Sequence, residues 1–175
     1  KTDIRGQVVT MHNILTIIND EVKELGNSAP EIYWSVENNS LGEAALIVIE
    51  EMDEDRFPGT FLHEPKKKGR QRVSRKGFTT TYKSKITACM KMKSWIESDK
   101  MIPLSNNLIR ELKTFIAKGK SYEAKTGETD DLVSATLLCV RQIQVISRFE
   151  EGYEELLGER LDVDVEFNEP LPIIF

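Results

Sequence analysis

The chain has few of the residues that mark disulfide-rich or zinc-binding proteins. Its 175 residues include only two cysteines and two histidines. The cysteines do not have zinc-ligand spacing, and both fall in apolar helical patterns, so we expect Cys89 and Cys139 to be buried free thiols in a reducing compartment. Neither His12 nor His63 has a partner at metal-ligand spacing. We therefore expect both histidines to be structural or on the surface.

Long apolar runs, a signal peptide and a nucleotide-binding loop are missing as well. No run approaches the ~18 apolar residues that span a bilayer, so no membrane partner is expected. Residues 1–5 lack the apolar core of a signal peptide, and no initiator Met is present, which indicates a fragment or a processed product. No G-x-x-x-x-G-K-[ST] sequence occurs, which argues against an ATPase site of that type. The length and the 39% hydrophobic content predict one soluble globular domain.

Acidic residues are absent from one segment of the chain. Eleven Lys or Arg and no acid lie between Pro65 and Ile96, which leaves 13 basic and all 29 acidic residues elsewhere, a net charge of −16. A segment of +11 on such a body predicts a surface that binds a polyanion. The residues that we expect to contact DNA are Lys66, Lys67, Lys68, Arg70, Arg72, Arg75, Lys76, Lys83 and Lys85.

Hydrophobic periodicity predicts helices alternating with short strands. We expect helices at about 8–25, 40–52, 82–98, 105–117 and 129–149, and strands at 31–36, 60–63, 101–103 and 121–124. Ser40 is the expected N-cap of the second helix. The basic residues 65–77 predict an exposed loop or hairpin. The pattern favours an α/β domain around a mixed or parallel sheet over residues 1–160, followed by an extended tail over 161–175.

Two adjacent carboxylates, Asp130 and Asp131, lead directly into the apolar helix that follows Gly127. One acid at a helix start is ordinary, because the free N–H groups and the helix dipole favour an anion there. A doublet is less ordinary, because like charges near a core repel one another unless a cation binds. Two interpretations stay open here: a divalent-metal site, or an Asp N-cap with a solvated neighbour.

Glu37 is the second candidate acid. It follows a strand in which Ile32, Trp34 and Val36 alternate, and it precedes a helix, a position where sites gather in open α/β sheets. The Asn-rich turn and Gly42 would allow unusual backbone angles and close approach of a ligand. The alternative is a surface glutamate in a polar turn.

Taken together, Glu37 and Asp131 offer the hard oxygen ligands that suit Mg²⁺ or Mn²⁺. Two metal ions held by carboxylates can activate water and stabilise the leaving oxygen in phosphodiester hydrolysis. With the basic segment, these acids indicate a nuclease. Trp34 and Trp95 fit core positions, whereas Phe78 and Tyr82 are the aromatic side chains better placed to stack on bases.

Several short pieces of the sequence carry a family resemblance. In order they are Ile32-Tyr33 leading to Glu37-Asn38-Asn39-Ser40-Leu41-Gly42, then Glu97-Ser98-Asp99-Lys100-Met101-Ile102, Ile109-Arg110-Glu111-Leu112-Lys113-Thr114-Phe115 and Gly127-Glu128-Thr129-Asp130-Asp131-Leu132-Val133. With these, residues 8–147 resemble the C-terminal nuclease domain of tailed-bacteriophage large terminases, especially the T-even type. The combination is more specific than any one piece.

The resemblance implies a ribonuclease H-like fold and a metal-dependent endodeoxyribonuclease that cuts concatemeric double-stranded DNA into genome lengths. It makes Glu37 the middle catalytic acid and Asp131 the third, with Asp130 as an accompanying or alternate ligand of two Mg²⁺ or Mn²⁺ ions. It also implies a viral protein acting in the host cytoplasm, with portal and small terminase subunits as partners.

The chain departs from the family at its beginning. The family's first acid lies inside a strand, whereas Asp3 precedes a helix. The resemblance therefore places the first strand with its Asp, and the ATPase motor domain, N-terminal to Lys1, and this chain alone is expected to have reduced or no activity. Two alternatives stay open: another ribonuclease H-like nuclease of the junction-resolvase type, and a non-catalytic DNA-binding module.

Overall fold

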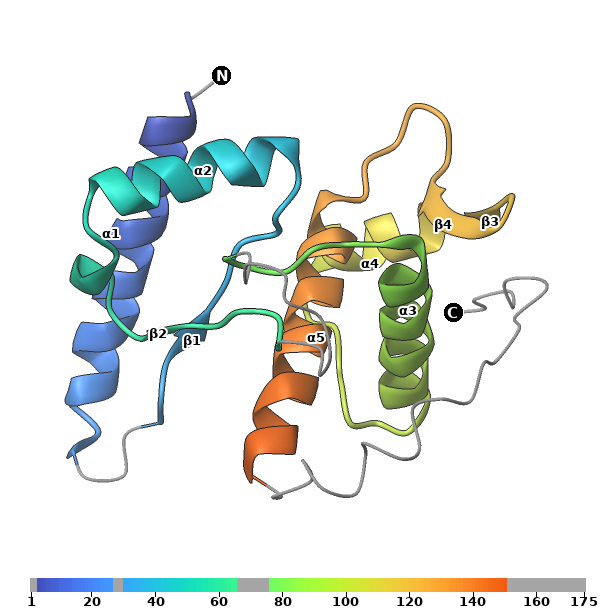
Figure 1. The fold of residues 1–175 in the computed structure, drawn as a ribbon. Helices are drawn as coiled ribbons and strands as arrows, with labels where there is room; N and C mark the ends of the chain where they lie inside the picture. The colour runs from blue at the N-terminus through green and yellow to red at the C-terminus, as the bar shows by residue number, and fades with distance from the viewer. Residues whose placement is uncertain (1–2, 27–29, 66–75, 151–175) are drawn as a thin grey trace. The chain divides into compact units, whose positions relative to one another are not determined.

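The computed structural model of the protein describes residues 3–26, 30–65 and 76–150 (Figure 1). The chain divides into two compact units, Lys1–Thr80 and Thr81–Phe175, and each is described by itself. The tail predicted at 161–175, and all of the expected basic loop except Pro65, Lys76 and Gly77, lie outside the described residues.

The first unit contains two helices, a 3₁₀ turn and two short strands. These elements are α1 (Ile4–Lys23), β1 (Tyr33–Trp34), α2 (Ser40–Glu51), η2 (Glu54–Arg56) and β2 (Thr60–Phe61). The strands pair in parallel, with Tyr33 opposite Thr60 and Trp34 opposite Phe61. Helix α2 packs across α1 (Figure 1).

Polar side chains set the starts of both helices in this unit. The Asp3 carboxylate accepts the N–H of Gly6 at 2.7 Å, which fixes the start of α1. Asn39, and not Ser40 as predicted, caps α2: its side chain accepts the N–H of Gly42 at 3.0 Å. The helix therefore begins directly after Asn39, with Ser40 as its first residue.

An apolar core joins α1, α2 and the strands of the first unit. The residues that it buries are Val8, Leu15, Trp34, Ile49 and Phe57. Trp34 stacks on Phe61, with ring centroids 4.2 Å apart. The prediction that Trp34 belongs to a core is confirmed, and its burial anchors the strand that leads to Glu37.

The second unit contains three helices and a hairpin. Its elements are α3 (Tyr82–Glu97), α4 (Asn106–Thr114), β3 (Phe115–Lys118), β4 (Ser121–Ala124) and α5 (Asp131–Glu150). The hairpin is antiparallel, with Phe115 opposite Ala124 and Lys118 opposite Ser121. Helix α5 packs against both α3 and α4 (Figure 1).

The second core is larger and includes residues from every element of its unit. It buries Ile86, Ala88, Cys89, Met92, Leu112, Phe115, Tyr122, Val133, Leu137 and Val140. Burial raises the pKa of the Cys89 thiol to about 12, so this cysteine behaves as a small apolar side chain. Trp95 is half-buried and packs against the same core.

Three local predictions are wrong. Residues 101–103 form no strand: Ile102 is 69% exposed, and Pro103 has no N–H to donate to a ladder. The helix expected to reach residue 117 ends at Thr114, because Phe115 and Ile116 enter the hairpin. Cys139 is exposed and not buried, because it faces away from the packed side of α5.

The broad prediction of a mixed α/β chain is confirmed, although helices dominate. The described residues form five α-helices and two sheets of two strands each. They show no larger central sheet. No helix among them is long and apolar enough to cross a bilayer.

Candidate functional site

Glu37 lies three residues after β1 of the first unit, where the chain forms a bridge to Phe78. Its side chain is half-buried and accepts a hydrogen bond from Nδ2 of Asn39 at 2.8 Å. Upstream, Trp34 is buried, with Ile32 and Val36 half-buried on the same alternating positions. The expected alternation therefore places the Glu37 side chain opposite the core-facing residues.

Backbone hydrogen bonds hold the chain on both sides of Glu37. The N–H of Phe78 donates to the carbonyl of Val36 at 3.0 Å, and the N–H of Asn38 donates to the carbonyl of Phe78 at 2.7 Å. These bonds form a parallel bridge between Glu37 and Phe78. The Asn38 side chain adds a bond to the carbonyl of Lys76 at 2.9 Å. Glu37 is thus placed by main-chain contacts.

Two glycines make this arrangement possible. A Cβ on Gly42 would lie 1.7 Å from the carbonyl oxygen of Glu37, and one on Gly77 would lie 2.3 Å from that of Val36. Gly77 also has a φ of +74°, which side-chain-bearing residues rarely adopt. The space that the sequence suggested for a ligand beside Gly42 is filled by the chain's own backbone.

Asp130 and Asp131 lie at the start of α5 in the second unit. Asp131 is the helix's first residue and is exposed, while Asp130 immediately precedes it and is half-buried. The helix that follows buries Val133, Leu137 and Val140, as its apolar pattern predicted. The doublet therefore sits where packed core meets solvent.

The cap of α5 comes from another helix. Glu111 on α4 accepts the N–H of Leu132 at 2.8 Å and that of Val133 at 3.1 Å through one oxygen. Its other oxygen accepts the hydroxyl of Thr129 at 3.1 Å. These are the groups that an N-cap side chain normally serves. Neither Asp130 nor Asp131 caps this helix through its carboxylate in the described structure.

Sequence reasoning missed the role of Glu111, although a signal for it exists. Leu108 and Leu112 of α4, and Phe115 just after its end, follow helical spacing on one packed side, and Glu111 falls on the same side. An acid at a core position needs hydrogen-bond donors. The exposed fraction of Glu111, only 8%, shows that it occupies such a position.

Three residues of the predicted DNA-binding set are described in the structure. Lys83 is exposed near the start of α3. The Lys85 ammonium lies 3.6 Å from the carboxylate of Asp130 and 5.4 Å from the centroid of the Phe115 ring. Lys76 forms an ion pair with Glu54 at 2.6 Å, and that hydrogen bond raises the lysine's pKa. The other six, Lys66, Lys67, Lys68, Arg70, Arg72 and Arg75, lie outside the described residues.

The aromatic candidates for base stacking differ in exposure. Phe78 is 1% exposed and so has no free ring face, whereas Tyr82 is 46% exposed. The parallel bridge to Glu37 fixes the backbone of Phe78 at this buried position. Of these two residues, only Tyr82 presents an accessible ring.

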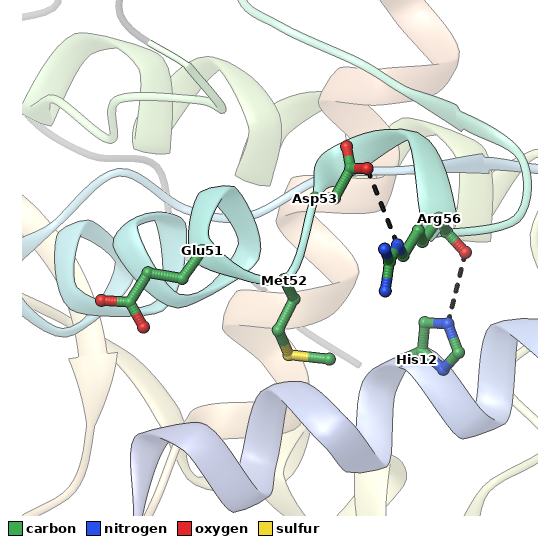
Figure 2. A pocket seen from close by; sticks show the side chains of 5 residues that line it. All are labelled: His12, Glu51, Met52, Asp53 and Arg56. Atoms are coloured by element: carbon green, nitrogen blue, oxygen red, sulfur yellow. Dashed lines mark hydrogen bonds and ion pairs between the residues drawn. The ribbon is translucent and has the colours of Figure 1, made fainter.

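Both histidines have structural contacts, as expected. The Nδ1 atom of His63 accepts the N–H of Gly77 at 3.1 Å. His12 lies 3.2 Å from the carbonyl of Arg56 and packs edge-on against Phe57. Figure 2 shows the surface hollow, of about 360 Å³, that His12 lines together with Glu51, Met52, Asp53 and Arg56. None of the predicted site residues lines it.

The two aspartates supply only part of what a divalent cation needs. Asp130 and Asp131 offer hard carboxylate oxygens, and Mg²⁺ commonly takes one or two carboxylates and keeps several waters. Glu111 is committed to its three hydrogen bonds. Within neither unit do three His, Cys, Asp or Glu of the described residues converge as a metal site. The two aspartates are therefore suitable as part of a metal-ligand set. Glu37, the remaining candidate acid, belongs to the other unit.

Comparison with models of known protein families gives no match for this chain, and comparison with solved structures gives none either.

Proposed function

We propose that the chain is the nuclease part of a viral DNA-packaging terminase, with a ribonuclease H-like fold and a metal-dependent endonuclease activity. The proposal depends on one observation: the carboxylates of Asp130 and Asp131 do not cap α5. Because Glu111 caps α5, neither aspartate is needed as a cap. Two adjacent carboxylates at the edge of a core, free of that structural duty, support a cation-binding role.

The ordered sequence pieces from Ile32 to Val133 add support of a different kind. Through the family resemblance, they imply that Glu37 and Asp131 are catalytic acids and that Asp130 is an accompanying ligand of Mg²⁺ or Mn²⁺. Such ions, when bound, activate water and stabilise the leaving oxygen of a phosphodiester. The chain's own part is to hold these carboxylates: the parallel bridge to Phe78 orients Glu37, and Glu111 fixes the start of α5.

Double-stranded DNA is the proposed substrate because of the basic segment. Lys83 lies in the first turn of α3, where a cation opposes the helix dipole at a cost of about 0.3–1 kcal/mol. Contact with phosphates would offset this cost and would make binding sensitive to salt without reading sequence. Portal and small terminase subunits as partners, and a motor domain N-terminal to this chain, belong to the same proposal, as does action in the host cytoplasm.

One observation favours a second candidate, a non-catalytic DNA-binding module. In the described part of each unit, no three ligand-type residues converge on a point where an ion could sit. On this alternative the acids have only structural roles, and the basic segment alone carries the function.

Metal-dependent cleavage separates the two candidates. The chain, extended to the complete domain that the resemblance implies, is incubated with supercoiled plasmid and Mn²⁺, and nicked and linear products are quantified over time. We expect cleavage that Glu37→Gln and Asp131→Asn each reduce at least about a hundredfold, while Glu97→Gln, at an exposed residue of α3, leaves it unchanged. DNA binding without Mn²⁺-dependent cleavage by the unaltered complete domain would favour the binding module. Much faster cleavage of branched DNA would favour a junction resolvase.

A further inference from the structure

Helix α3 carries four of the eleven basic residues of the acid-free segment, and two of these four have acidic partners. The Lys85 ammonium lies 3.6 Å from the carboxylate of Asp130. The Lys93 ammonium lies 3.7 Å from the carboxylate of Glu97, one turn further along the same helix. Only 22% and 27% of these two lysine side chains are exposed. Both ion pairs reduce the charge that the two lysines can offer to a polyanion.

The other two lysines of α3, Lys83 and Lys91, are exposed and lie on one side of the helix. Residues four, eight and eleven positions apart return to the same side of an α-helix, so Thr87 and Ser94 share that side, and both are exposed as well. We call these four residues the basic stripe. The opposite side of α3 packs into the second core. In the described part of the second unit, no carboxylate forms an ion pair with either lysine of the stripe.

The basic stripe suits a phosphate backbone by charge and by length. It contains two cations, two hydroxyls and no acid. Eight residues separate Lys83 from Lys91, which corresponds to about 12 Å along the helix axis. A DNA duplex carries one negative charge per about 1.7 Å of its axis, so the two ammonium groups can reach different phosphates. The Thr87 hydroxyl donates to the carbonyl of Lys83 at 2.9 Å, and Ser94 offers a hydroxyl donor of the kind that often contacts phosphate oxygens.

An aromatic ring orients the second lysine of the stripe. The Lys91 ammonium lies over the ring of Trp95, 5.5 Å from its centroid, and Trp95 is half-buried and packs against the second core. A cation is attracted to the face of an indole ring, but the ring carries no net charge that would neutralise it. Lys91 therefore differs from Lys85 and Lys93: its side chain has a partner, and its charge remains available to an anion.

We propose that the basic stripe of α3 lies along the sugar–phosphate backbone of double-stranded DNA. This inference rests on the proposed function and deepens it, because it adds Lys91 and Ser94 to the DNA contacts expected from the sequence. Contacts with phosphates fix the position of a protein on the duplex without reading its bases, and each one that a lysine makes contributes to the salt dependence of binding. The stripe should therefore affect affinity and salt dependence, and not sequence preference.

Two double variants that lose the same charge test the stripe. Lys83→Gln with Lys91→Gln removes both of its cations, whereas Lys93→Gln with Lys118→Gln removes two lysines that already form ion pairs. The whole chain is titrated with a fluorescent duplex at several salt concentrations, and its affinity is measured by anisotropy. We expect the stripe variant to bind at least about tenfold more weakly, with a slope of log K against log salt that is shallower by about 2, and the control to stay within about threefold. Ser94→Ala should weaken binding about two- to threefold.

The outcomes separate this inference from the proposed function. Equal weakening by the two double variants overturns the inference, because net charge and not the stripe would then attract DNA. A stripe variant that binds DNA like the unaltered chain also overturns it, since the stripe would then face another partner such as an acidic protein surface. Either result leaves the nuclease proposal intact if the complete domain cleaves DNA with Mn²⁺. Loss of affinity confined to the stripe variant, without any cleavage by the complete domain, removes the nuclease proposal and supports the inference.

Discussion

The two acidic positions are held in place by different parts of the chain. Glu37 is fixed by main-chain bonds to Phe78 and by the close approach of Gly42. Asp130 and Asp131 are fixed by one side chain, that of Glu111. A position held by backbone tolerates changes to neighbouring side chains but not to its glycines. A position held by a buried carboxylate depends on that one residue.

Gly42→Ala should give the largest effect. The added Cβ would lie 1.7 Å from the carbonyl oxygen of Glu37, so the chain must shift where α2 begins. We expect the free energy of unfolding to fall by at least about 3 kcal/mol, although alanine favours a helix by about 1 kcal/mol over glycine. Urea denaturation followed by circular dichroism measures this change.

The matched control is Gly26→Ala, in the same unit. Its Cβ would meet nothing within 4 Å, so only the positive φ of +66° opposes it, a cost of about 1–2 kcal/mol. A Gly42→Ala variant as stable as this control would show that the backbone around Glu37 yields easily. Glu37 would then not depend on the close approach of Gly42, and the two acidic positions would not differ in this respect.

Phe78 and Tyr82 provide the next test. Removing the buried ring in Phe78→Ala should cost about 3–5 kcal/mol of unfolding free energy, whereas Tyr82→Ala should stay within about 0.5 kcal/mol. Only Tyr82→Ala should weaken DNA binding of the folded fraction, which fluorescence anisotropy with a labelled duplex measures. Weaker binding by folded Phe78→Ala alone would contradict this expectation.

Lys85→Gln should give the smallest effect and the most specific one. The Lys85 ammonium lies 3.6 Å from the Asp130 carboxylate, and under the proposed function it would compete with a metal ion for that carboxylate. Exposed or half-exposed ion pairs contribute about 0–1 kcal/mol, so we expect Mn²⁺ to bind about two- to fivefold more tightly once the charge is gone. Lys83→Gln, at an exposed position two residues away, is the control and should leave Mn²⁺ affinity unchanged. Weaker Mn²⁺ binding by Lys85→Gln would contradict the competition.

Much of the local structure was predictable, because it depends on neighbours in the sequence. The apolar spacing of α1, α2, α3 and α5 places these helices to within a few residues of their observed bounds, α1 being the least accurate. The hairpin was only half predicted: β4 lies where expected, but β3 was assigned to a helix. Helical spacing continues through Phe115 and Ile116, and only pairing with β4 decides against it.

The candidate site was predicted as residue types but not as an arrangement. The repulsion expected of two adjacent acids made Asp130 and Asp131 conspicuous from the sequence alone. Their cap was not foreseen, because Glu111 lies about twenty residues away on another helix. The ion pair between Lys85 and Asp130 joins residues still farther apart in the sequence, and it gives a lysine that was predicted to bind DNA an acidic neighbour inside its own unit.

The sequence by itself determined which residues can carry charge, bind a cation or start a helix, since those properties belong to single side chains and their near neighbours. Tertiary structure alone decided which of them are left available for chemistry. Packing α4 against α5 brings Glu111 to the three donors. The bridge between Glu37 and Phe78 places Gly77 where a side chain would clash with the backbone. Such outcomes follow from contacts between segments far apart in the chain, which local patterns do not encode.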